Sequence, residues 1–445
     1  MAVERRNAGF YGWRVVHAAF LLAVFGWGMG FYGPPVFLGV MGQSGSWSVA
    51  LVSLAVSFHF VAGAVTGAKL PILHRRFGIA AVTKAGALSM SAGVLGWSVV
   101  ESPRQLFLSA LLSGVGWGTM SAAALNAIVS PWFVRARPAA LGMAYNGGSV
   151  GGIVFSPLWV AAIGALGFPA AASVVAAIML VTIWALADKV FCHTPETMRL
   201  KPDGIEPGDS IFSVTSPSAR PLPGARLWRD RKFLSLAAGM SLGLFAQIGL
   251  TAHLFSLLVP ALGPINAGSA MAAVTLMAIV GRSLLGWLMP LRADRRLVAC
   301  SGYVLQIGGS VAFILAEGAS VPLLLVGVVL FGMGFGNATS LPPLIAQVEF
   351  VKEDVPRVAA LVVAIAQGGY AIAPAFFGIV RTYAAQTRTT AQGDAPLLFA
   401  IVMAVQCLAV CAFLAGRQTP PPTDRPGSAP EKQAHLTLSG INAAR

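Results

Sequence analysis

Residues 132–152 read WFVRARPAALGMAYNGGSVGG, and this segment decides the fold. It begins with two arginines near two prolines and continues into an apolar run rich in glycine and alanine. Such a run forms a weak helix in water, but in lipid its small residues let two helix backbones approach closely. Glycines four residues apart, such as Gly147 and Gly151, predict this kind of helix–helix contact. We therefore interpret the segment as a membrane-spanning helix preceded by a short basic loop.

A similar segment occurs in the second part of the chain. The sequence Arg-Pro-Ala-Ala-Leu at residues 137–141 has a counterpart, Arg-Val-Ala-Ala-Leu, at residues 357–361, and each leads into an apolar run with a Gly-Gly pair. The runs GVGWG at 114–118 and GMGFG at 332–336 repeat at almost the same separation. Because these pairs occupy corresponding places, they predict that one membrane unit is present twice.

The composition places most of the chain in a membrane. Of its 445 residues, 56% are hydrophobic and only 10% are charged, whereas a soluble globular protein has about 25% charged residues. A net charge of +14 also occurs in nucleic-acid-binding proteins, but here the basic residues lie in alternate loops rather than in one basic region. We therefore expect no nucleic acid as a partner, and we expect the lipid bilayer to surround the chain.

Runs of roughly 20 apolar residues, enough to cross a bilayer, recur along the chain. We expect six spans before a polar, proline-rich stretch and six after it, near residues 14–39, 47–70, 79–100, 105–130, 139–163, 169–187, 233–258, 267–289, 297–316, 322–346, 358–383 and 397–415. The expected units are a first six-helix half at 10–188, a cytoplasmic linker at 189–232, a second six-helix half at 233–416 and a disordered cytoplasmic tail at 417–445.

The positions of Lys and Arg predict how the chain lies in the membrane. With the N-terminus in the cytoplasm, the external loops hold only Arg104, Arg381 and Arg388. Arg282 lies inside a span, and the remaining basic residues fall on the cytoplasmic side. Positively charged loops stay on the cytoplasmic side during insertion. We therefore expect a multi-pass protein of the cell inner membrane with both termini in the cytoplasm.

The six-plus-six plan, the long middle loop and the basic loops after the second and eighth spans resemble the major facilitator superfamily of transporters. Within it, the sequence Tyr-Gly-Trp at 11–13 and residues 132–152 resemble the branch of monocarboxylate porters and oxalate/formate antiporters. The resemblance implies an all-α polytopic membrane protein with twelve transmembrane helices in two six-helix halves. It also implies alternating access, with the substrate held near the bilayer midplane between the halves.

The loop after the second span departs from the superfamily's usual pattern, Gly-x-x-x-Asp-Arg-x-Gly. Here Arg75 stands at the position of the Asp and is followed by Arg76, whereas the second half keeps the acidic residue as Asp294 before Arg295. By resemblance, these four residues belong to the loops that stabilise one conformation of the transporter. The departure at Arg75 makes that role less expected in the first half than in the second.

One permanent cation lies deep in an expected span. Asp and Glu are absent from all the expected spans, but Arg282 lies in the eighth, about seven residues before its cytoplasmic end. An arginine at the centre of a membrane helix costs about 2.5–3.5 kcal/mol to insert, and a guanidinium binds a carboxylate through two parallel hydrogen bonds. We interpret Arg282 as the ligand of a substrate carboxylate, which the resemblance also implies. The alternative is a structural role in capping helix carbonyls.

Other polar side chains at membrane depth are candidates for the same site. By resemblance, an oxalate-type exchanger has a lysine in the eleventh span, where this chain has Gln367 and Tyr370. A single fixed cation neutralises one carboxylate, so we expect a monoanion. Tyr145 and Asn146 lie at the corresponding place in the first half, and Gln247 lies in the seventh span. Each of these five residues can bind substrate or join neighbouring helices.

Two histidines are candidates for carrying a coupled proton. His59 lies in the middle of the second span and His253 in the outer half of the seventh. An imidazole titrates near neutral pH and is the best available proton carrier in spans that have no carboxylate. The alternative for both residues is a structural hydrogen bond between helices.

These observations predict a secondary active transporter for a small organic monoanion, by resemblance a monocarboxylate, with a coupled proton as an option. Within the same class, the alternative is an efflux carrier for a hydrophobic compound. From a different class, it is a membrane sensor or scaffold that binds a ligand without moving it. The four cysteines have no metal-ligand spacing, and no nucleophile has a partnered base. We expect no enzymatic activity, no metal and no cofactor, and we expect a monomer.

Overall fold

Every regular element in the part of the chain that the structure describes is a helix. The computed structural model describes residues 10–43, 47–204, 224–289, 293–351, 354–387 and 395–417. Eleven of the described helical segments are long and apolar enough to cross a membrane. The expected tail beyond residue 417, most of the expected linker and Arg388 lie outside the described residues.

One of these segments, α11 (Arg231–Leu288), is too long for a single crossing. It has 58 residues, and at about 1.5 Å per residue it is nearly three times as long as the bilayer core is thick. Its backbone breaks at Gly263, which has φ 76° between Pro260 and Pro264. Glycine adopts this conformation without the steric cost of a Cβ atom. α11 therefore contains two spans, and the described helices account for the expected all-α fold with twelve.

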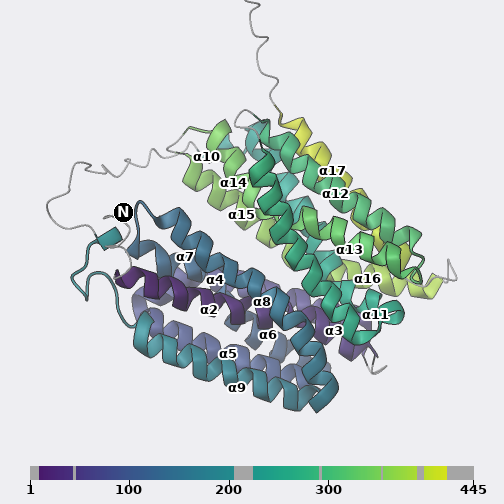
Figure 1. Cartoon of the computed structure of the whole chain (residues 1–445), viewed down its shortest axis with the longest axis horizontal. Coiled ribbons are helices and arrows are strands. Elements are labelled where there is room, and N and C mark those ends of the chain that lie inside the picture. Colours follow the sequence, from purple (N-terminus) through teal and green to yellow (C-terminus); the bar gives the residue numbers. More distant parts are fainter. Residues whose placement is uncertain are drawn as a thin grey trace, which may run out of the picture.

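The helices form two groups (Figure 1). The first consists of α2 (Tyr11–Gly30), α3 (Gly33–Gln43), α4 (Val49–Phe77), α5 (Ile79–Ser98), α6 (Pro103–Met120), α7 (Ala122–Val129), α8 (Arg137–Leu166) and α9 (Phe168–Leu186). The second consists of α11, α12 (Arg295–Leu315), α13 (Val321–Phe335), α14 (Asn337–Glu349), α15 (Val355–Ala371), α16 (Ala373–Thr387) and α17 (Ala395–Ala415). Short helices in the connections are η1 (Ser130–Trp132), η2 (Ala187–Phe191), η3 (Pro202–Gly204) and α10 (Gly224–Leu227).

The glycines of the segment 132–152 serve the packing that their spacing predicts. On α8, a Cβ atom added to Gly147 would lie 2.2 Å from the carbonyl oxygen of Phe20 on α2. One added to Gly151 would lie 2.5 Å from the carbonyl oxygen of Val24, one turn further along α2. Both distances are shorter than a carbon–oxygen contact allows. The close approach of α8 to α2 therefore requires glycine at both positions.

The two groups of helices contact each other near one end of the bundle. We call the end with the turns at Gly167 and Gly263 the far end, and the end with Phe10 and the η1–α8 loop the near end. At the far end, the amide N–H of Ala375, in the first turn of α16, donates a hydrogen bond to the Ser57 hydroxyl of α4 at 2.8 Å. Figure 1 shows the ribbons of the two groups diverging from there towards the near end.

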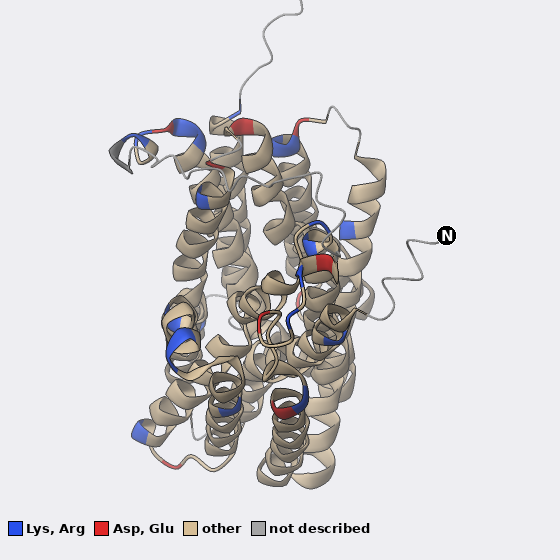
Figure 2. Cartoon of the chain, turned by 90° about the vertical axis from the view of Figure 1, so that its left-hand side faces the viewer, with Lys and Arg blue, Asp and Glu red and all other residues tan. Residues whose placement is uncertain are grey.

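Charged residues lie mainly outside the apolar helix centres. Figure 2 looks at the bundle from the near end and shows the Lys and Arg segments, with fewer Asp and Glu segments, at helix ends and in connections. The long helical stretches between them carry other residues. This distribution suits helices whose centres lie in hydrocarbon, where a charged side chain is costly.

The described part of the linker is attached to the η1–α8 loop, a contact that the sequence does not predict. The carboxylate of Asp203, in η3, accepts hydrogen bonds from the backbone N–H groups of Val134, Arg135 and Ala136 at 3.0, 2.7 and 3.2 Å. Successive N–H groups in such a loop form a binding site for an anionic group. The linker therefore supplies the anion that holds the basic loop before α8.

Replacing Asp203 with Ala is expected to free this loop. Hydrogen bonds to a charged group contribute about 1.5–3 kcal/mol, so local opening should become at least about tenfold more frequent. Trypsin cleavage after the exposed Arg135, followed by mass spectrometry of the purified protein, measures this opening. Asp188→Ala is the matched control, because the Asp188 carboxylate pairs with Lys84 instead. Equal cleavage rates in the two variants would contradict the prediction.

Candidate site between the two groups of helices

Arg282 lies on the part of α11 that follows Gly263, at the boundary with the first group. Its side chain is exposed, and its charge interacts with Tyr32, which lies between α2 and α3. Its Nε atom donates a hydrogen bond to the carbonyl oxygen of Gly336 at 3.1 Å. The guanidinium is therefore held by the second group and faces a residue of the first.

Arg282 and Gln247 meet at the break between α13 and α14. A helix break leaves carbonyl oxygens without their usual partners. Nε2 of Gln247 donates to the carbonyl oxygen of Phe335 at 3.1 Å, and Arg282 donates to the next one, that of Gly336. This is the capping contact that the sequence leaves as the alternative for Arg282, but it uses Nε alone. The two terminal nitrogens have no hydrogen-bond partner among the described residues, so they can bind an anion.

The two candidates on α8 lie apart from Arg282. Tyr145 is exposed, and its hydroxyl donates a hydrogen bond to the carbonyl oxygen of Ala122 on α7 at 3.4 Å. Asn146, the next residue, is exposed as well. Within the described residues, neither side chain forms a hydrogen bond with Arg282. Tyr145 and Asn146 thus form a separate polar cluster near the start of α8.

The two candidates on α15 differ in their surroundings. Tyr370 is half-buried, and its ring contacts that of Phe60 on α4 at a centroid distance of 6.0 Å. Because α4 belongs to the first group and α15 to the second, Tyr370 lies at their boundary, as Arg282 does. Gln367 is also half-buried, one turn nearer the start of α15.

Both nitrogens of His59 are engaged within the first group. Its Nε2 lies 2.8 Å from the carbonyl oxygen of Gly30, and its Nδ1 lies 2.8 Å from the hydroxyl of Ser113. A carbonyl only accepts hydrogen bonds, so Nε2 carries a proton and donates to Gly30. The Ser113 hydroxyl also lies 3.2 Å from the carbonyl oxygen of Ala110, and the indole N–H of Trp97 donates to it at 3.1 Å. This network joins four helices around the imidazole, which favours the structural alternative for His59.

The surroundings of His253 correct the placement of Arg381. Arg381 is not in an external loop: it lies within α16, and only 8% of it is exposed. Its Nη1 donates to the hydroxyl of Ser256 at 2.7 Å and approaches Nδ1 of His253 at 3.4 Å. Nε2 of His253 lies 3.1 Å from the carbonyl oxygen of Pro374. Polar atoms of α11 contact the charge of Arg381 within the bundle, and a hydropathy pattern does not reveal such contacts.

The near end of the second group is held by ion pairs. Asp294 caps α12, accepting from the backbone N–H of Arg296 at 2.9 Å, and pairs with Arg417 at 2.5 Å. Partial burial alone would raise the pKa of the Asp294 carboxyl, but the bonds from Arg417 and from the backbone N–H groups outweigh it and hold this pKa below its usual value. Arg295 donates to the carbonyl oxygen of Leu344 at 2.6 Å.

A second pair in this region joins Glu349, whose side chain is 16% exposed, to the buried Arg296. Nε and Nη2 of Arg296 contact the two carboxylate oxygens of Glu349 at 2.6 and 2.8 Å. The Arg296 side chain is only 1% exposed. The sequence pattern indicated Asp294 and Arg295 but not this pair. A Glu at the very end of an apolar span was the available signal.

The corresponding loop of the first group has a different arrangement. Arg75 and Arg76 lie in the last turn of α4 and are exposed. The guanidinium of Arg76 lies 5.1 Å from the centre of the Phe77 ring. Among the described residues, neither arginine forms an ion pair like that of Asp294 with Arg417.

A polytopic helical protein whose two groups of helices meet at one end, with polar side chains at their boundary, has the architecture of a secondary transporter. The sequence model of the Major Facilitator Superfamily matches residues 17–374, well over half of the chain. The chain belongs to this superfamily, and its membership indicates a transporter rather than an enzyme. No curated protein matches the sequence.

Solved transporter structures share this fold. The nucleoside transporter NupG has a TM-score of 0.69 with 15% identity, covering 91% of this chain and 98% of that one. A bacterial homolog of the human lysosomal transporter Spinster, inward-facing and unoccupied, has a TM-score of 0.70 with 15% identity, covering 92% and 99%. The peptide transporter POT in complex with sulfate has a TM-score of 0.67 with 15% identity, covering 90% and 94%.

Proposed function

We propose that this transporter carries a small organic monoanion, with a monocarboxylate as the substrate class, as in the branch that its sequence resembles. The observation that supports this most is the guanidinium of Arg282. It is a permanent cation on a helix that contains no Asp or Glu from Arg231 to Leu288. Its exposed side chain leaves two nitrogens available at the boundary between the two groups of helices.

In this proposal, the substrate carboxylate binds the two terminal nitrogens of Arg282. Parallel N–H groups fit the two oxygens of a carboxylate, and such charge-assisted bonds are strong where water is excluded. Tyr370 lies at the same boundary and is placed to contact the rest of the substrate. Tyr145, Asn146 and Gln367 are proposed to reach the substrate when the two groups move, and Gln247 to hold the break beside Arg282. One cation at this place favours a monoanion over a dianion.

We further propose that the near end of the bundle faces the cytoplasm, in a cell inner membrane. The excess of Lys and Arg at that end supports this orientation. The contacts at the far end, including that between Ser57 and Ala375, would then close the external side. A neighbour of similar fold is described as inward-facing, which agrees with such a state. Movement of one group against the other would open the opposite side.

A coupled proton remains part of the proposal, with His253 as the better candidate of the two histidines. It lies on α11, and its partners Pro374 and Arg381 belong to α16, whose Ala375 bonds to Ser57 of the first group. Separation of the two groups at this end would therefore change the surroundings of its partners. His59 has both nitrogens in hydrogen bonds of 2.8 Å, whereas Nδ1 of His253 has a contact of 3.4 Å with Arg381.

Ligand screening of the purified protein tests the proposal. A ligand at 100 times its Kd stabilises the folded state by about 2.7 kcal/mol, which a thermal-shift measurement detects. We expect monocarboxylates to raise Tm more than dicarboxylates, amines or hydrophobic compounds do. Counterflow of a labelled hit in proteoliposomes then separates a transporter from a sensor. Stabilisation by amines or hydrophobic compounds alone would refute the proposed substrate class.

A further inference from the structure

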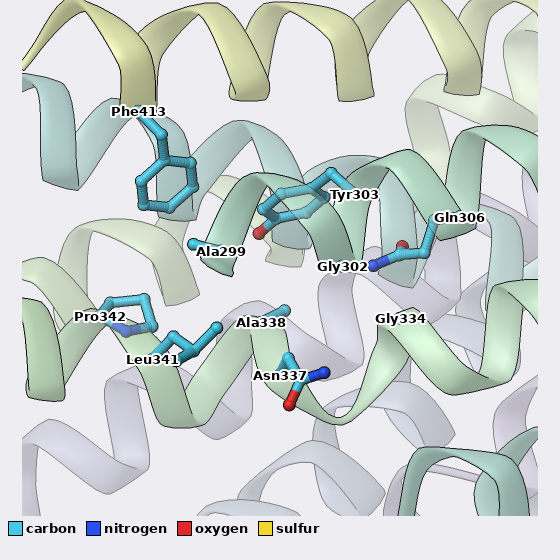
Figure 3. Close-up of a pocket in the computed structure, with 10 residues that line it drawn as sticks. All are labelled: Ala299, Gly302, Tyr303, Gln306, Gly334, Asn337, Ala338, Leu341, Pro342 and Phe413. Carbon is cyan, nitrogen blue, oxygen red and sulfur yellow. The ribbon is translucent and has the colours of Figure 1, made fainter. Parts of the chain in front are cut away.

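A small cavity lies within the second group of helices (Figure 3). Its volume is about 10 Å³, which is the space that a single water molecule requires. α12, α13, α14 and α17 surround it, and Gly302 and Gly334 contribute backbone to its wall. It is separate from Arg282, which is not among its lining residues.

Three buried polar side chains line this cavity, and each has one atom without a hydrogen-bond partner in the described part of the protein. These atoms are the hydroxyl of Tyr303, Nε2 of Gln306 and Oδ1 of Asn337, and none has a hydrogen bond within the described residues. The three residues are 2%, 0% and 5% exposed. Figure 3 shows the Tyr303 hydroxyl and the Gln306 amide nitrogen turned towards the space beside Gly302, with Asn337 across from them and its carboxamide oxygen turned away from that space. Buried polar atoms of this kind normally have a partner, because each has lost its hydrogen bonds to water.

The three groups suit one water molecule. A water needs two to four polar partners and typically makes three hydrogen bonds in a protein interior. The amide nitrogen of Gln306 donates, the Tyr303 hydroxyl donates or accepts, and the amide nitrogen of Asn337, which would lie 4.0 Å from a Cβ atom at Gly302, donates from the other side. Gln306 is itself oriented by Gln406 of α17, whose Nε2 donates to the Gln306 carbonyl oxygen at 3.2 Å.

A metal cation suits the cavity less well. Calcium needs six to eight oxygen ligands, and magnesium is bound through carboxylates, whereas the ten lining residues include no Asp or Glu. The N–H groups of Gln306 would also point their positive ends at a cation. The side chains around the cavity therefore favour a small neutral molecule that both donates and accepts hydrogen bonds.

We propose that one ordered water molecule binds in this cavity and joins Tyr303, Gln306 and Asn337. Asn337 is the first residue of α14, directly after the break at Gly336. The water thus connects α12 to the start of α14.

Replacing Gly302 with Ala tests the proposal by filling the cavity. A Cβ atom at Gly302 would lie 3.6 Å from the Gly334 carbonyl oxygen and 3.7 Å from Cβ of Asn337, so the methyl fits without a clash. In a dry cavity the variant should be more stable, because Ala favours helix more than Gly does. If water is bound, the methyl displaces it and leaves three polar groups unpaired.

The matched control is Gly308→Ala, one and a half turns along the same helix. Its added Cβ would meet only Leu330, at 3.6 Å, away from the cavity. We expect the Tm of Gly302→Ala to be lower than that of Gly308→Ala by about 2 °C or more. A Tm of Gly302→Ala equal to or above that of Gly308→Ala would overturn the proposal.

Tyr303→Phe gives an independent result if Gly302→Ala does not yield folded protein. Removing a hydroxyl that has no partner should raise Tm, whereas removing one that binds a water should lower it. We expect Tm to fall. A raised Tm, or an experimental structure that shows ordered waters elsewhere in the protein interior but none here, would also overturn the proposal.

Discussion

Arg282→Gln is expected to abolish uptake of the organic anion into proteoliposomes while the protein still folds. The substitution removes two charge-assisted hydrogen bonds, each contributing about 1.5–3 kcal/mol. The resulting loss of affinity is at least about 100-fold. Initial rates of labelled substrate uptake measure it, and thermal unfolding in detergent verifies the fold. The substitution also removes the hydrogen bond from Nε of Arg282 to the Gly336 carbonyl oxygen. Because the Arg282 side chain is exposed, water can take the place of this donor, and we expect Tm to fall only slightly.

Two further variants isolate the chemistry of the guanidinium. Arg282→Lys keeps the charge but loses the fork of donors, so we expect measurable uptake with a raised KM. Arg104→Gln makes the same change in charge at an exposed position near the start of α6, and we expect normal uptake. Wild-type uptake by Arg282→Gln, with a functional ligand identified, would remove the assigned role and leave the superfamily membership unaffected.

The Glu349→Gln variant is expected to lower the free energy of unfolding by about 3–5 kcal/mol. Arg296 is 1% exposed, and its terminal nitrogens also donate to the Ser235 hydroxyl and to the carbonyl oxygens of Phe413 and Lys232. An amide at position 349 leaves this charge buried without its counter-ion. Chemical denaturation of the purified protein in detergent measures the effect.

Two comparisons show whether burial is the cause. Asp188→Asn makes the same chemical change in the pair with Lys84, whose two side chains are 55% and 23% exposed, and should cost about 0–1 kcal/mol. Replacing both partners, with Arg296→Met and Glu349→Leu together, should recover most of the stability, because no charge is then left unpaired. A Glu349→Gln variant no less stable than Asp188→Asn would show that the buried pair contributes little.

The broad architecture could be predicted because it depends on the length and polarity of segments. Twelve apolar runs, a repeated glycine pattern and basic alternate loops are properties of the chain itself, and a bilayer imposes a fixed thickness on each run. The spacing of Gly147 and Gly151 likewise predicted a close helix contact, because a helix repeats its faces every three to four residues.

The details of the candidate site could not be predicted in this way. The sequence placed Arg381 in an external loop, and the structure buries it against His253 and Ser256. The sequence left His59 as a proton carrier or a structural residue, and only its partners Gly30 and Ser113 distinguish the two. These partners come from helices 29 and 54 residues away along the chain.

The amino-acid sequence was enough to establish a helical membrane protein, and it predicted a duplicated plan and a deep arginine in a span without acids. It could do so because burial in lipid constrains composition locally, one segment at a time. Only the tertiary structure decided what that arginine touches, where the two groups of helices meet, and which buried polar atoms share a cavity. Those features depend on helix crossings between segments that are distant in sequence, and a crossing leaves no periodic pattern in either segment alone.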